Sequence, residues 1–306
     1  MEFETVENRV RKIAGDRALY VLTDTNVDRL TRTLLSDCPR LVVEAGESCK
    51  SLDGAMEVWE FLEKNGAVRN SILINVGGGM VSDLGGFAAS TFKRGIGCIN
   101  LPTTLLAAVD AAIGGKTGIN FMGLKNEIGT FALPLAVMPL MSLFRYLPEE
   151  EWLSGVGEAI KTGMLAGDEL YRLATSRSFI QDRESEVVKK VVETCAEFKQ
   201  KVVAEDFKEK GKRRILNIGH TWGHALEAWM MARGKSVPHG IAVAYGLLET
   251  LKKSGLATDA YQEILNKYFP ALDITEKDRE EISRYMAYDK KNNKIGEPNW
   301  VLLNRV

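Results

Sequence analysis

Cysteine is scarce in this 306-residue sequence, and its four cysteines, Cys38, Cys49, Cys98 and Cys195, are scattered without paired spacing. That pattern argues against a disulfide framework and against a zinc knuckle. No apolar run approaches the ~20 residues that a membrane-spanning helix requires. The charged N-terminal stretch also lacks the apolar core of a signal peptide. We therefore expect free thiols and a cytoplasmic location.

An excess of either charge is also missing. The 40 Lys and Arg residues and 41 Asp and Glu residues give a net charge of −1, so we expect neither a nucleic-acid surface nor an acidic tail. Any anion site must therefore come from local clustering of basic residues. The hydrophobic fraction of 45% is ordinary for a soluble globular protein, and the length suggests two domains with a shared cleft.

Histidine is scarcer still: the chain has three histidines, and all of them lie within Leu216–Gly240. His220 and His224 are four residues apart in a stretch with helical spacing, which places both on one helical face. His239 follows in a predicted loop that can fold back. Three imidazoles arranged in this way can converge on a divalent cation. A solvated or hydrogen-bonded helical pair is the alternative.

The N-terminal half of the sequence alternates short apolar runs with amphipathic stretches, and the C-terminal half is mostly helical in pattern. Alternation of strand and helix predicts a parallel α/β sheet. The predicted strands are 18–22, 40–43 and 71–76, and the predicted helices are 27–35, 52–64 and one beginning near Val81. Later helices are predicted at 149–164, 184–204, 220–231, 241–253 and 259–267, with a last strand at 299–306. We expect two domains, 1–144 and 145–306.

A strand followed by Gly77–Gly79 and a helix can let a pyrophosphate approach the backbone and the helix N-terminus. This is not the G-x-G-x-x-G pattern, and a purely structural turn is the alternative. Asp83, expected in the first helical turn, favours the helix dipole or binds a ribose hydroxyl. Asp24, Glu47 and Lys50 follow the first two predicted strands, where open α/β sheets bind ligands. Ordinary turn chemistry is the alternative for these three.

The stretch from Pro102 to Asn126 combines small residues with isolated polar and charged groups. Charges are costly to bury unless they are paired or bind a ligand, so we expect a site here. Its polar members are Thr103, Thr104, Asp110, Lys116, Lys125 and Asn126. Gly114–Thr117 is similar to a phosphate loop, but Asp110 stands where the first glycine of that motif would be.

Glu158 lies among small apolar residues in a predicted helix, which makes it a candidate metal ligand. A surface i, i+3 pair with Lys161 is the alternative. Lys199, Arg213 and Asn217 precede the histidines. They form either an anion pocket or an ordinary solvated face.

Taken together, these stretches closely resemble the dehydroquinate synthase family of sugar-phosphate cyclases. The motifs that carry the resemblance are GGGMVSDLGGF, RGIGCINLPTTLLAAVDAAIGGKTGIN, GLKNEIGTF, LSGVGEAIKTG, LNIGHTWGHALE, PHG and DKKNNKIG. With the loops at Asp24 and Glu47 they span residues 24 to 296 in the family's order. The fold class that the resemblance implies is α/β plus all-α. A Rossmann-like NAD-binding domain comes first, followed by a helical metal- and substrate-binding domain.

The resemblance also implies roles for individual residues. The implied NAD contacts are Asp24, Glu47, Lys50, Gly78, Gly79, Asp83, Thr103 and Thr104. The implied ligands of a Zn2+ or Co2+ ion are Glu158, His220 and His239. The implied phosphate contacts are Lys116, Asn126, Asn217 and His224, with Arg94 lent by the neighbouring subunit of a homodimer. Lys199, Arg213 and a lysine of Asp289-Lys290-Lys291, taken as Lys290, match groups near the substrate carboxylate and ring. Asp110, Lys125 and Lys161 match further active-site positions, Lys125 on the cofactor side.

Helical spacing alone would make both His220 and His224 metal ligands. The resemblance instead assigns His220 and His239 to the metal and leaves His224 facing substrate, and we follow it. Three departures from the family pattern stand out. The chain begins close to the first strand and ends soon after VLL. Ile241 occupies a position where the family typically has Glu. A glutamate there would support a metal ligand by hydrogen bonding without itself binding the metal.

The implied activity is conversion of 3-deoxy-D-arabino-heptulosonate 7-phosphate to 3-dehydroquinate and phosphate, a step of the shikimate pathway. The implied enzyme is a lyase that uses NAD+ transiently and a divalent metal. It acts on a small sugar phosphate, without nucleic acid or membrane. The alternatives are an inosose- or valiolone-forming cyclase, a glycerol-1-phosphate-type dehydrogenase, and a non-catalytic relative that binds NAD or metal.

Overall fold

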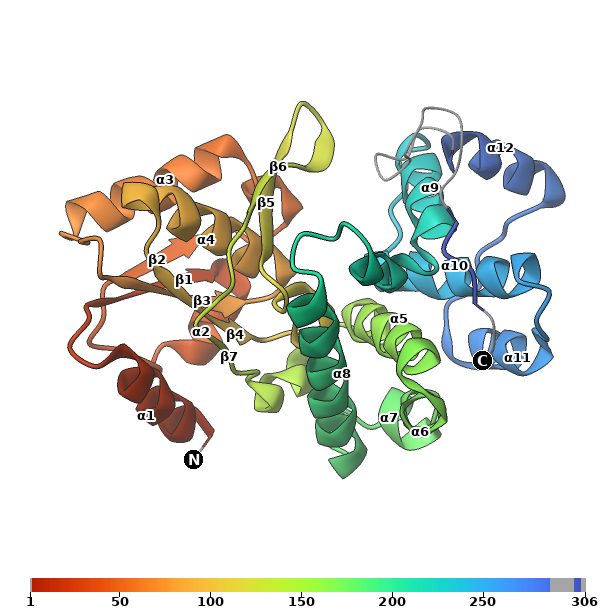
Figure 1. Ribbon diagram of the computed structural model, residues 1–306, viewed down its shortest axis with the longest axis horizontal. Helices are drawn as coiled ribbons and strands as arrows, with labels where there is room; N and C mark the ends of the chain where they lie inside the picture. The colour runs from red at the N-terminus through yellow and green to blue at the C-terminus, as the bar shows by residue number, and fades with distance from the viewer. Residues whose placement is uncertain (1, 287–299, 304–306) are drawn as a thin grey trace. The chain divides into compact units, whose positions relative to one another are not determined.

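The computed structural model describes residues 2–286 and 300–303 (Figure 1). The chain divides into two compact units, Met1–Leu147 (unit 1) and Pro148–Val306 (unit 2). The division falls three residues after the expected boundary at 144, because the 3-10 helix η4 (Met141–Tyr146) belongs with unit 1. Its residue Leu143 packs into a core cluster of the unit 1 sheet.

Unit 1 is built on a parallel five-stranded sheet with the strand order β2-β1-β3-β4-β7. The strands are β1 (Leu19–Asp24), β2 (Arg40–Val43), β3 (Ile72–Gly77), β4 (Gly97–Pro102) and β7 (Ala136–Val137). The connecting helices are α2 (Thr25–Thr31), α3 (Leu52–Lys64) and α4 (Gly79–Thr91). The predicted parallel α/β sheet is confirmed.

Neighbouring residues of the central strand enter cores on opposite faces of this sheet, as the two-residue period of a strand requires. Leu73 packs with residues of α3 and α4, whereas Ile74 packs with residues of α1 (Glu2–Ala14). Figure 1 shows α3 and α4 on one side of the sheet and α1 on the other. Helix α1 was not anticipated, although its three buried residues, Val6, Val10 and Ala14, follow a four-residue spacing.

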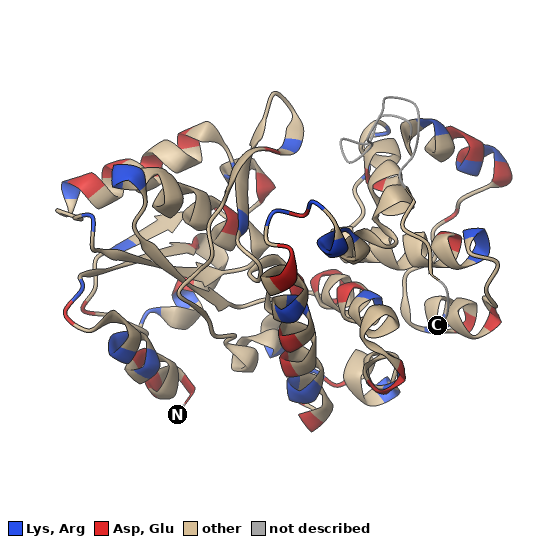
Figure 2. Ribbon diagram, viewed as in Figure 1, with Lys and Arg blue, Asp and Glu red and all other residues tan. Residues whose placement is uncertain are grey.

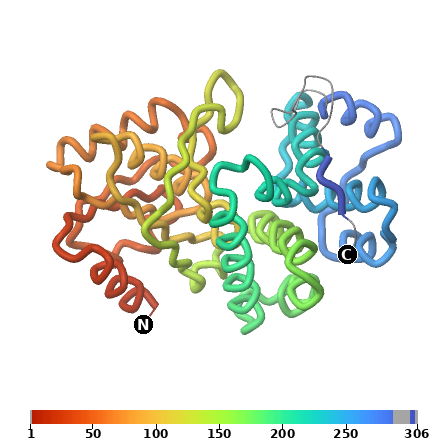
Figure 3. Tube along the Cα trace, viewed as in Figure 1, coloured from red at the N-terminus to blue at the C-terminus, as the bar shows by residue number. Residues whose placement is uncertain are grey.

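An antiparallel hairpin, β5 (Lys116–Phe121) and β6 (Leu124–Phe131), extends from unit 1 (Figure 3). Lys116, Lys125 and Asn126 lie on it and are exposed. The burial cost that suggested a site at these three residues therefore does not apply to them. The hairpin also exposes large apolar side chains, namely Phe121, Met122, Leu124, Ile128 and Phe131.

Helices joined by loops make up the described residues of unit 2, as predicted for the C-terminal part of the chain. Its helices are α5 (Glu149–Ala166), α6 (Asp168–Ala174), α7 (Arg177–Gln181), α8 (Glu186–Glu205), η5 (Lys212–Asn217), α9 (His220–Met231), α10 (His239–Lys253), α11 (Asp259–Tyr268) and α12 (Glu276–Met286). No helix in the described part of the chain is both long enough and apolar enough to cross a membrane.

The strand predicted at 299–306 is wrong for the residues that the structure describes, 300–303, which have no strand geometry. Trp300 instead packs against the core cluster that contains Trp222 and Trp229 of α9. The Leu303 backbone N–H donates to Ser254 Oγ at 3.1 Å rather than to another strand. Trp300 therefore covers helices instead of extending a sheet.

Glycines allow α5 and α10 to touch backbone to backbone. A Cβ atom on Gly157 would lie 2.0 Å from the Gly240 carbonyl oxygen, and one on Gly240 would lie 1.7 Å from the Ser154 carbonyl oxygen. The Gly240 N–H also donates to Ser154 Oγ at 2.9 Å. Helix α9 meets α10 in the same way, because a Cβ on Gly246 would lie 1.9 Å from the Gly219 carbonyl oxygen. These contacts fix the positions of the neighbouring residues Glu158, His239 and His220.

We predict that Gly240→Ala destabilises the protein, because the added methyl group forces α10 away from α5. Overpacking of this kind costs about 1–3 kcal/mol, against roughly 1 kcal/mol gained from the better helix propensity of Ala. Thermal unfolding monitored by circular dichroism measures the effect. The control Ser154→Ala removes the hydrogen bond to the same backbone without adding an atom. A Gly240→Ala protein whose melting temperature equals or exceeds that of the wild type would contradict the packing described here.

Candidate active site

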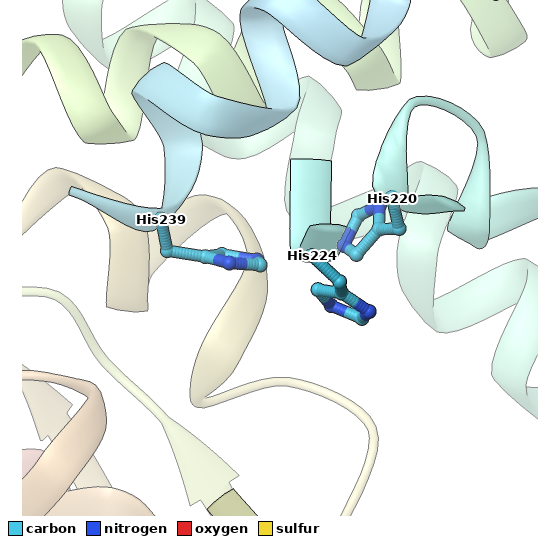
Figure 4. A group of neighbouring side chains, drawn as sticks. All are labelled: His220, His224 and His239. Atoms are coloured by element: carbon cyan, nitrogen blue, oxygen red, sulfur yellow. The ribbon is translucent and has the colours of Figure 1, made fainter. Parts of the chain in front are cut away.

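A buried carboxylate and the imidazoles come together from three helices of unit 2. Glu158 of α5 is fully buried, and its Oε1 lies 3.7 Å from His220 Nε2 and 3.4 Å from His239 Nε2. The ligand nitrogens of His220, His224 and His239 all lie within 4.8 Å of one another. Figure 4 shows His239, from the start of α10, extending toward the two histidines of α9. The arrangement brings nitrogen and oxygen donors to one point.

The ring orientations of two histidines match those of metal ligands. His220 Nδ1 lies 3.0 Å from the Ile218 carbonyl oxygen, and His239 Nδ1 lies 3.0 Å from Glu227 Oε2. An ionised carboxylate or a carbonyl only accepts hydrogen bonds, so both Nδ1 atoms carry the proton. Nε2 is then the ligating nitrogen of each ring, and both Nε2 atoms face Glu158 Oε1. Two imidazole nitrogens and one carboxylate oxygen form a donor set that Zn2+ binds.

The charges around His239 favour a cation. Burial lowers the pKa of His239, but the carboxylates of Glu227 and Glu158 outweigh it and raise the pKa to about 10. Lys161 Nζ lies 2.5 Å from Glu158 Oε2, and both side chains are buried. The pairing of these two residues was the alternative to a ligand role for Glu158, but the pair is not on the surface. Positive charge is thus favoured on both sides of the Glu158 carboxylate.

His224 belongs to the same cluster. Its ring centroid lies 5.3 Å from that of His220 and 5.8 Å from that of His239. By distance alone, a three-histidine ligand set fits as well as Glu158 with His220 and His239.

Three of the expected residues precede the histidines: Lys199 lies in α8, and Arg213 and Asn217 lie in η5, between α8 and α9. Lys199 and Arg213 are buried, so the solvated-face alternative is wrong for these two. An Arg213 guanidinium N–H donates to the Phe207 carbonyl at 2.6 Å, and Asn217 Nδ2 donates to Glu209 Oε1 at 2.7 Å. Figure 2 shows that basic residues are concentrated along this segment.

Asp206 organises the same segment. Its carboxylate accepts hydrogen bonds from the backbone N–H groups of Lys210, Gly211 and Arg213. These hydrogen bonds hold the pKa of Asp206 below its usual value. Sequence reasoning missed Asp206, Glu209 and Glu227. A signal existed only for Glu227, which lies three residues after His224 on one helix and so shares its face.

In unit 1, the predicted glycine turn leads from β3 into α4, with Gly78 at the N-cap. A Cβ on Gly78 would lie 3.1 Å from Thr104 Cγ2, and one on Gly79 would lie 3.3 Å from Ala111 Cβ. Thr103 Oγ1 is buried and has no hydrogen-bond partner within the described residues. A free helix N-terminus beside an unsatisfied hydroxyl suits a phosphate group.

A buried lysine connects the expected cofactor loops. Lys50 Nζ lies 2.8 Å from Asp83 Oδ2 and 3.4 Å from Glu47 Oε1. Burial lowers the pKa of Lys50, but these carboxylates raise it overall. The expectation that Asp83 lies in the first helical turn is wrong, because α4 begins at Gly79 rather than near Val81. Asp83 therefore pairs with Lys50 and does not face the helix dipole.

Asp24 is the N-cap of α2, and its side chain accepts from the N–H groups of Asn26 and Val27 at 2.9 and 3.0 Å. Burial raises the pKa of this carboxyl group. Capping is the ordinary turn chemistry that was weighed as the alternative for this residue, and it accounts for the observed contacts.

The remaining expected residues have varied surroundings. Asp110 lies in a π-helical turn, η3 (Ala107–Ala111). Asn100 Nδ2 donates to the carbonyl of Ala112 at 3.0 Å, and its Oδ1 accepts from Asn75 Nδ2 at 2.8 Å, which ties the end of this turn to the sheet. Arg94 is exposed and has a positive φ of 69°. Lys290, with Asp289 and Lys291, lies outside the described residues.

Comparison with known proteins identifies the family. The model of the 3-dehydroquinate synthase N-terminal domain matches residues 40–154, and that of the C-terminal domain matches residues 155–292. A 3-dehydroquinate synthase of Parabacteroides distasonis is 41% identical over 302 residues, which cover 94% of this chain and 85% of that protein. One of Thermococcus kodakarensis is 42% identical over 254 residues, which cover 80% of this chain and 71% of that protein.

Solved structures of two sugar-phosphate cyclases share the fold of this chain. A 2-deoxy-scyllo-inosose synthase complexed with carbaglucose-6-phosphate, NAD+ and Co2+ is 25% identical, with a TM-score of 0.83 over 98% of this chain and 86% of that chain. A 2-epi-5-epi-valiolone synthase from Streptomyces hygroscopicus shares the fold, with 24% identity and a TM-score of 0.79 over 95% of this chain and 87% of that chain. The α/β and helical units, the family models and the relatives agree: the chain belongs to the 3-dehydroquinate synthase family.

Proposed function

We propose that this chain catalyses the conversion of 3-deoxy-D-arabino-heptulosonate 7-phosphate to 3-dehydroquinate and phosphate, as a lyase dependent on NAD+ and a divalent metal. The observation that carries the proposal is the convergence of His220 Nε2 and His239 Nε2 on Glu158 Oε1, at 3.7 and 3.4 Å, in a chain of this family. Both rings have Nδ1 hydrogen-bonded to an acceptor, as metal-binding histidines usually do.

The residues present fit both expected groups. Glu158, His220 and His239 would hold Zn2+ or Co2+, and the buried carboxylates favour the added positive charge. The N-terminus of α4 at Gly78 and Gly79 has no side-chain cap and would bind a pyrophosphate through its backbone N–H groups, and the buried Thr103 hydroxyl would offer a further hydrogen bond. When bound, these two groups would supply Lewis-acid polarisation of a hydroxyl oxygen and reversible hydride exchange. The inosose synthase relative contains NAD+ and Co2+.

The chain's own cations would bind a substrate that carries a phosphate and a carboxylate. We assign Lys199 and Arg213 to the carboxylate, together with Lys290. The groups assigned to the phosphate are Lys116, Asn126, Asn217, His224 and Arg94. Charge-assisted hydrogen bonds to such anions are the strong kind. Because Lys199 and Arg213 are buried, salt screens them less than surface charges.

The proton transfers of the proposed reaction need few groups beyond those that bind the substrate. We assign half-exposed His224 to substrate and not to the metal because we follow the resemblance to the family, and in that role it would hold or move a proton beside the two assigned ligand histidines. The substrate phosphate itself can act as the base for its own elimination. Asp110, Lys125 and Lys161 would then complete the surroundings of the substrate and cofactor. The enzyme's main contribution would be positioning and electrostatic stabilisation.

A second cyclase activity deserves a test, because an inosose synthase matches 98% of this chain with a TM-score of 0.83. Substrate chemistry favours the first proposal. Two buried cations, Lys199 and Arg213, suit a substrate that has a carboxylate in addition to its phosphate. Glucose 6-phosphate lacks a carboxylate, and its carba analogue is the ligand in the inosose synthase structure.

The decisive experiment measures phosphate release by the purified protein with NAD+ and Zn2+ or Co2+. We expect release from 3-deoxy-D-arabino-heptulosonate 7-phosphate, with 3-dehydroquinate as product and no net change in NADH absorbance. Removal of the metal with a chelator should abolish turnover, and re-addition should restore it. Release from glucose 6-phosphate instead would favour the second activity. Net NADH formation would indicate a dehydrogenase, and metal and NAD binding without release a non-catalytic relative.

Two histidine variants separate ligand from substrate contact. We predict that His220→Ala loses bound metal and turnover together. His224→Ala should keep the metal but lower kcat/KM by about 10²–10⁴-fold, as is typical for a lost proton-transfer group. Metal content by mass spectrometry, measured with the steady-state kinetics, checks both. The assignment is reversed if His224→Ala purifies without metal and His220→Ala retains it.

We further infer a homodimer formed through the hairpin β5–β6. Its exposed side chains Phe121, Met122, Leu124, Ile128 and Phe131 form an apolar group on one element, and a cluster of this kind typically marks an interface. A second copy of the chain is the partner that fits, with Arg94 of each subunit serving the other's site.

The four cysteines are free, which suits the reducing cytoplasm in which we place the protein.

Subunit mixing tests this dimer. Arg94→Ala and Lys116→Ala should each be nearly inactive. Random re-association after mixing should restore about a quarter of wild-type activity, because half of the dimers are mixed and each of these has one complete site. Light scattering should show that Leu124→Glu/Ile128→Glu is monomeric, while Leu302→Glu in unit 2 is not. Absence of recovery with intact dimers would place Arg94 in its own subunit's site.

A further inference from the structure

The helix that carries His239 supplies no side-chain hydrogen bond to its ring from the position two residues further along. That position is Ile241, which is fully buried in α10. Its side chain offers no hydrogen-bond acceptor to the neighbouring His239. The other assigned histidine, His220, does not need a side chain for support, because its Nδ1 lies 3.0 Å from the Ile218 carbonyl of its own backbone. Any support for His239 must come from another element.

Helix α9 supplies an acceptor for His239. Glu227 Oε2 lies 3.0 Å from His239 Nδ1, and the Glu227 side chain is only 15% exposed. On the opposite edge of the ring, His239 Nε2 faces Glu158 Oε1 at 3.4 Å. The imidazole is therefore held between two carboxylates, one on each ring nitrogen. The His239 side chain is 32% exposed, so packing restrains it less than it restrains His220, which is 8% exposed.

We propose that Glu227 is the positioning residue for His239, fixing its tautomer and ring orientation through the 3.0 Å contact between Glu227 Oε2 and His239 Nδ1. This inference rests on the proposed metal site. Glu227 acts through His239 and does not itself bind the metal. An outer carboxylate of this kind keeps the proton on Nδ1 and makes Nε2 the ligating atom, and it raises the basicity of that atom.

Metal affinity, measured apart from activity, tests the proposal. Competition with a chromophoric chelator gives the dissociation constant for Zn2+. Replacing an outer partner of a ligand typically weakens metal binding by about 10–100-fold, which we expect for Glu227→Leu. Glu227→Gln retains an acceptor oxygen and should recover most of the loss. The visible spectrum of bound Co2+ should change for Glu227→Leu more than for Glu227→Gln.

A matched control separates this role from stability. Glu281 accepts a hydrogen bond from Trp229 Nε1 of the same helix at 3.2 Å, and it pairs with Arg233. Glu281→Gln should therefore change the melting temperature without changing the Zn2+ affinity or the Co2+ spectrum. An unchanged affinity and spectrum for folded Glu227→Leu would overturn the proposal.

The wild-type protein provides a test that needs no variant to fold. Nitrogen NMR of the Zn2+-loaded protein, labelled at its three histidines, reports which ring nitrogen carries the proton. We expect His239 to be protonated at Nδ1 and to bind through Nε2. A proton on Nε2 of His239 would overturn the role of Glu227. Absence of any metal binding by the wild type would instead overturn the proposed function, and this inference with it.

Discussion

Backbone contact between α5 and α10 is the constraint on which the chemistry of unit 2 depends. Neither Gly157 nor Gly240 has room for a Cβ atom, because Gly157 lies against the Gly240 carbonyl and Gly240 lies against the Ser154 carbonyl. Each glycine is the immediate sequence neighbour of an assigned metal ligand, Glu158 or His239. The contact that packs the helices therefore also sets the distance between the ligands. Gly219 and Gly246 place His220 in the same way at the contact of α9 with α10.

Charged groups in the two units are held by different means. In unit 2, Glu158, Lys161, Lys199 and Arg213 are all buried. Burial of a charge is costly unless it is paired, so these side chains are positioned by their partners before a substrate binds. In unit 1, Lys116, Lys125 and Asn126 lie exposed on a hairpin, where their polar groups remain accessible to water.

Part of this architecture follows from the sequence, since apolar periodicity records which side of an element is buried. The helices 52–64 and 220–231 have the bounds that the pattern predicts. Glycine carries no such signal, which is why α4 was expected to begin near Val81 instead of at Gly79 and Asp83 was misplaced. The apolar pattern of 299–306 predicted a strand, but the described residues 300–303 have no strand geometry and Trp300 packs on helices. A short apolar run does not show whether it packs against a sheet or against helices.

The site was predictable only in part. Helical spacing groups His220 with His224, but nothing in the spacing brings Glu158 to them across the intervening residues. That pairing came from the resemblance to the family. The contact between Glu227 and His239 depends on how α9 meets α10, so it became visible only in three dimensions.

Diffraction at the metal absorption edge tests most directly whether Glu158, His220 and His239 bind the metal. Crystals of the protein loaded with Zn2+ would give an anomalous peak at the ion. The ion should lie about 2.0–2.2 Å from Glu158 Oε1, His220 Nε2 and His239 Nε2, with His224 beyond bonding distance. An ion bound by all three histidines, with Glu158 turned away, would contradict this set of ligands.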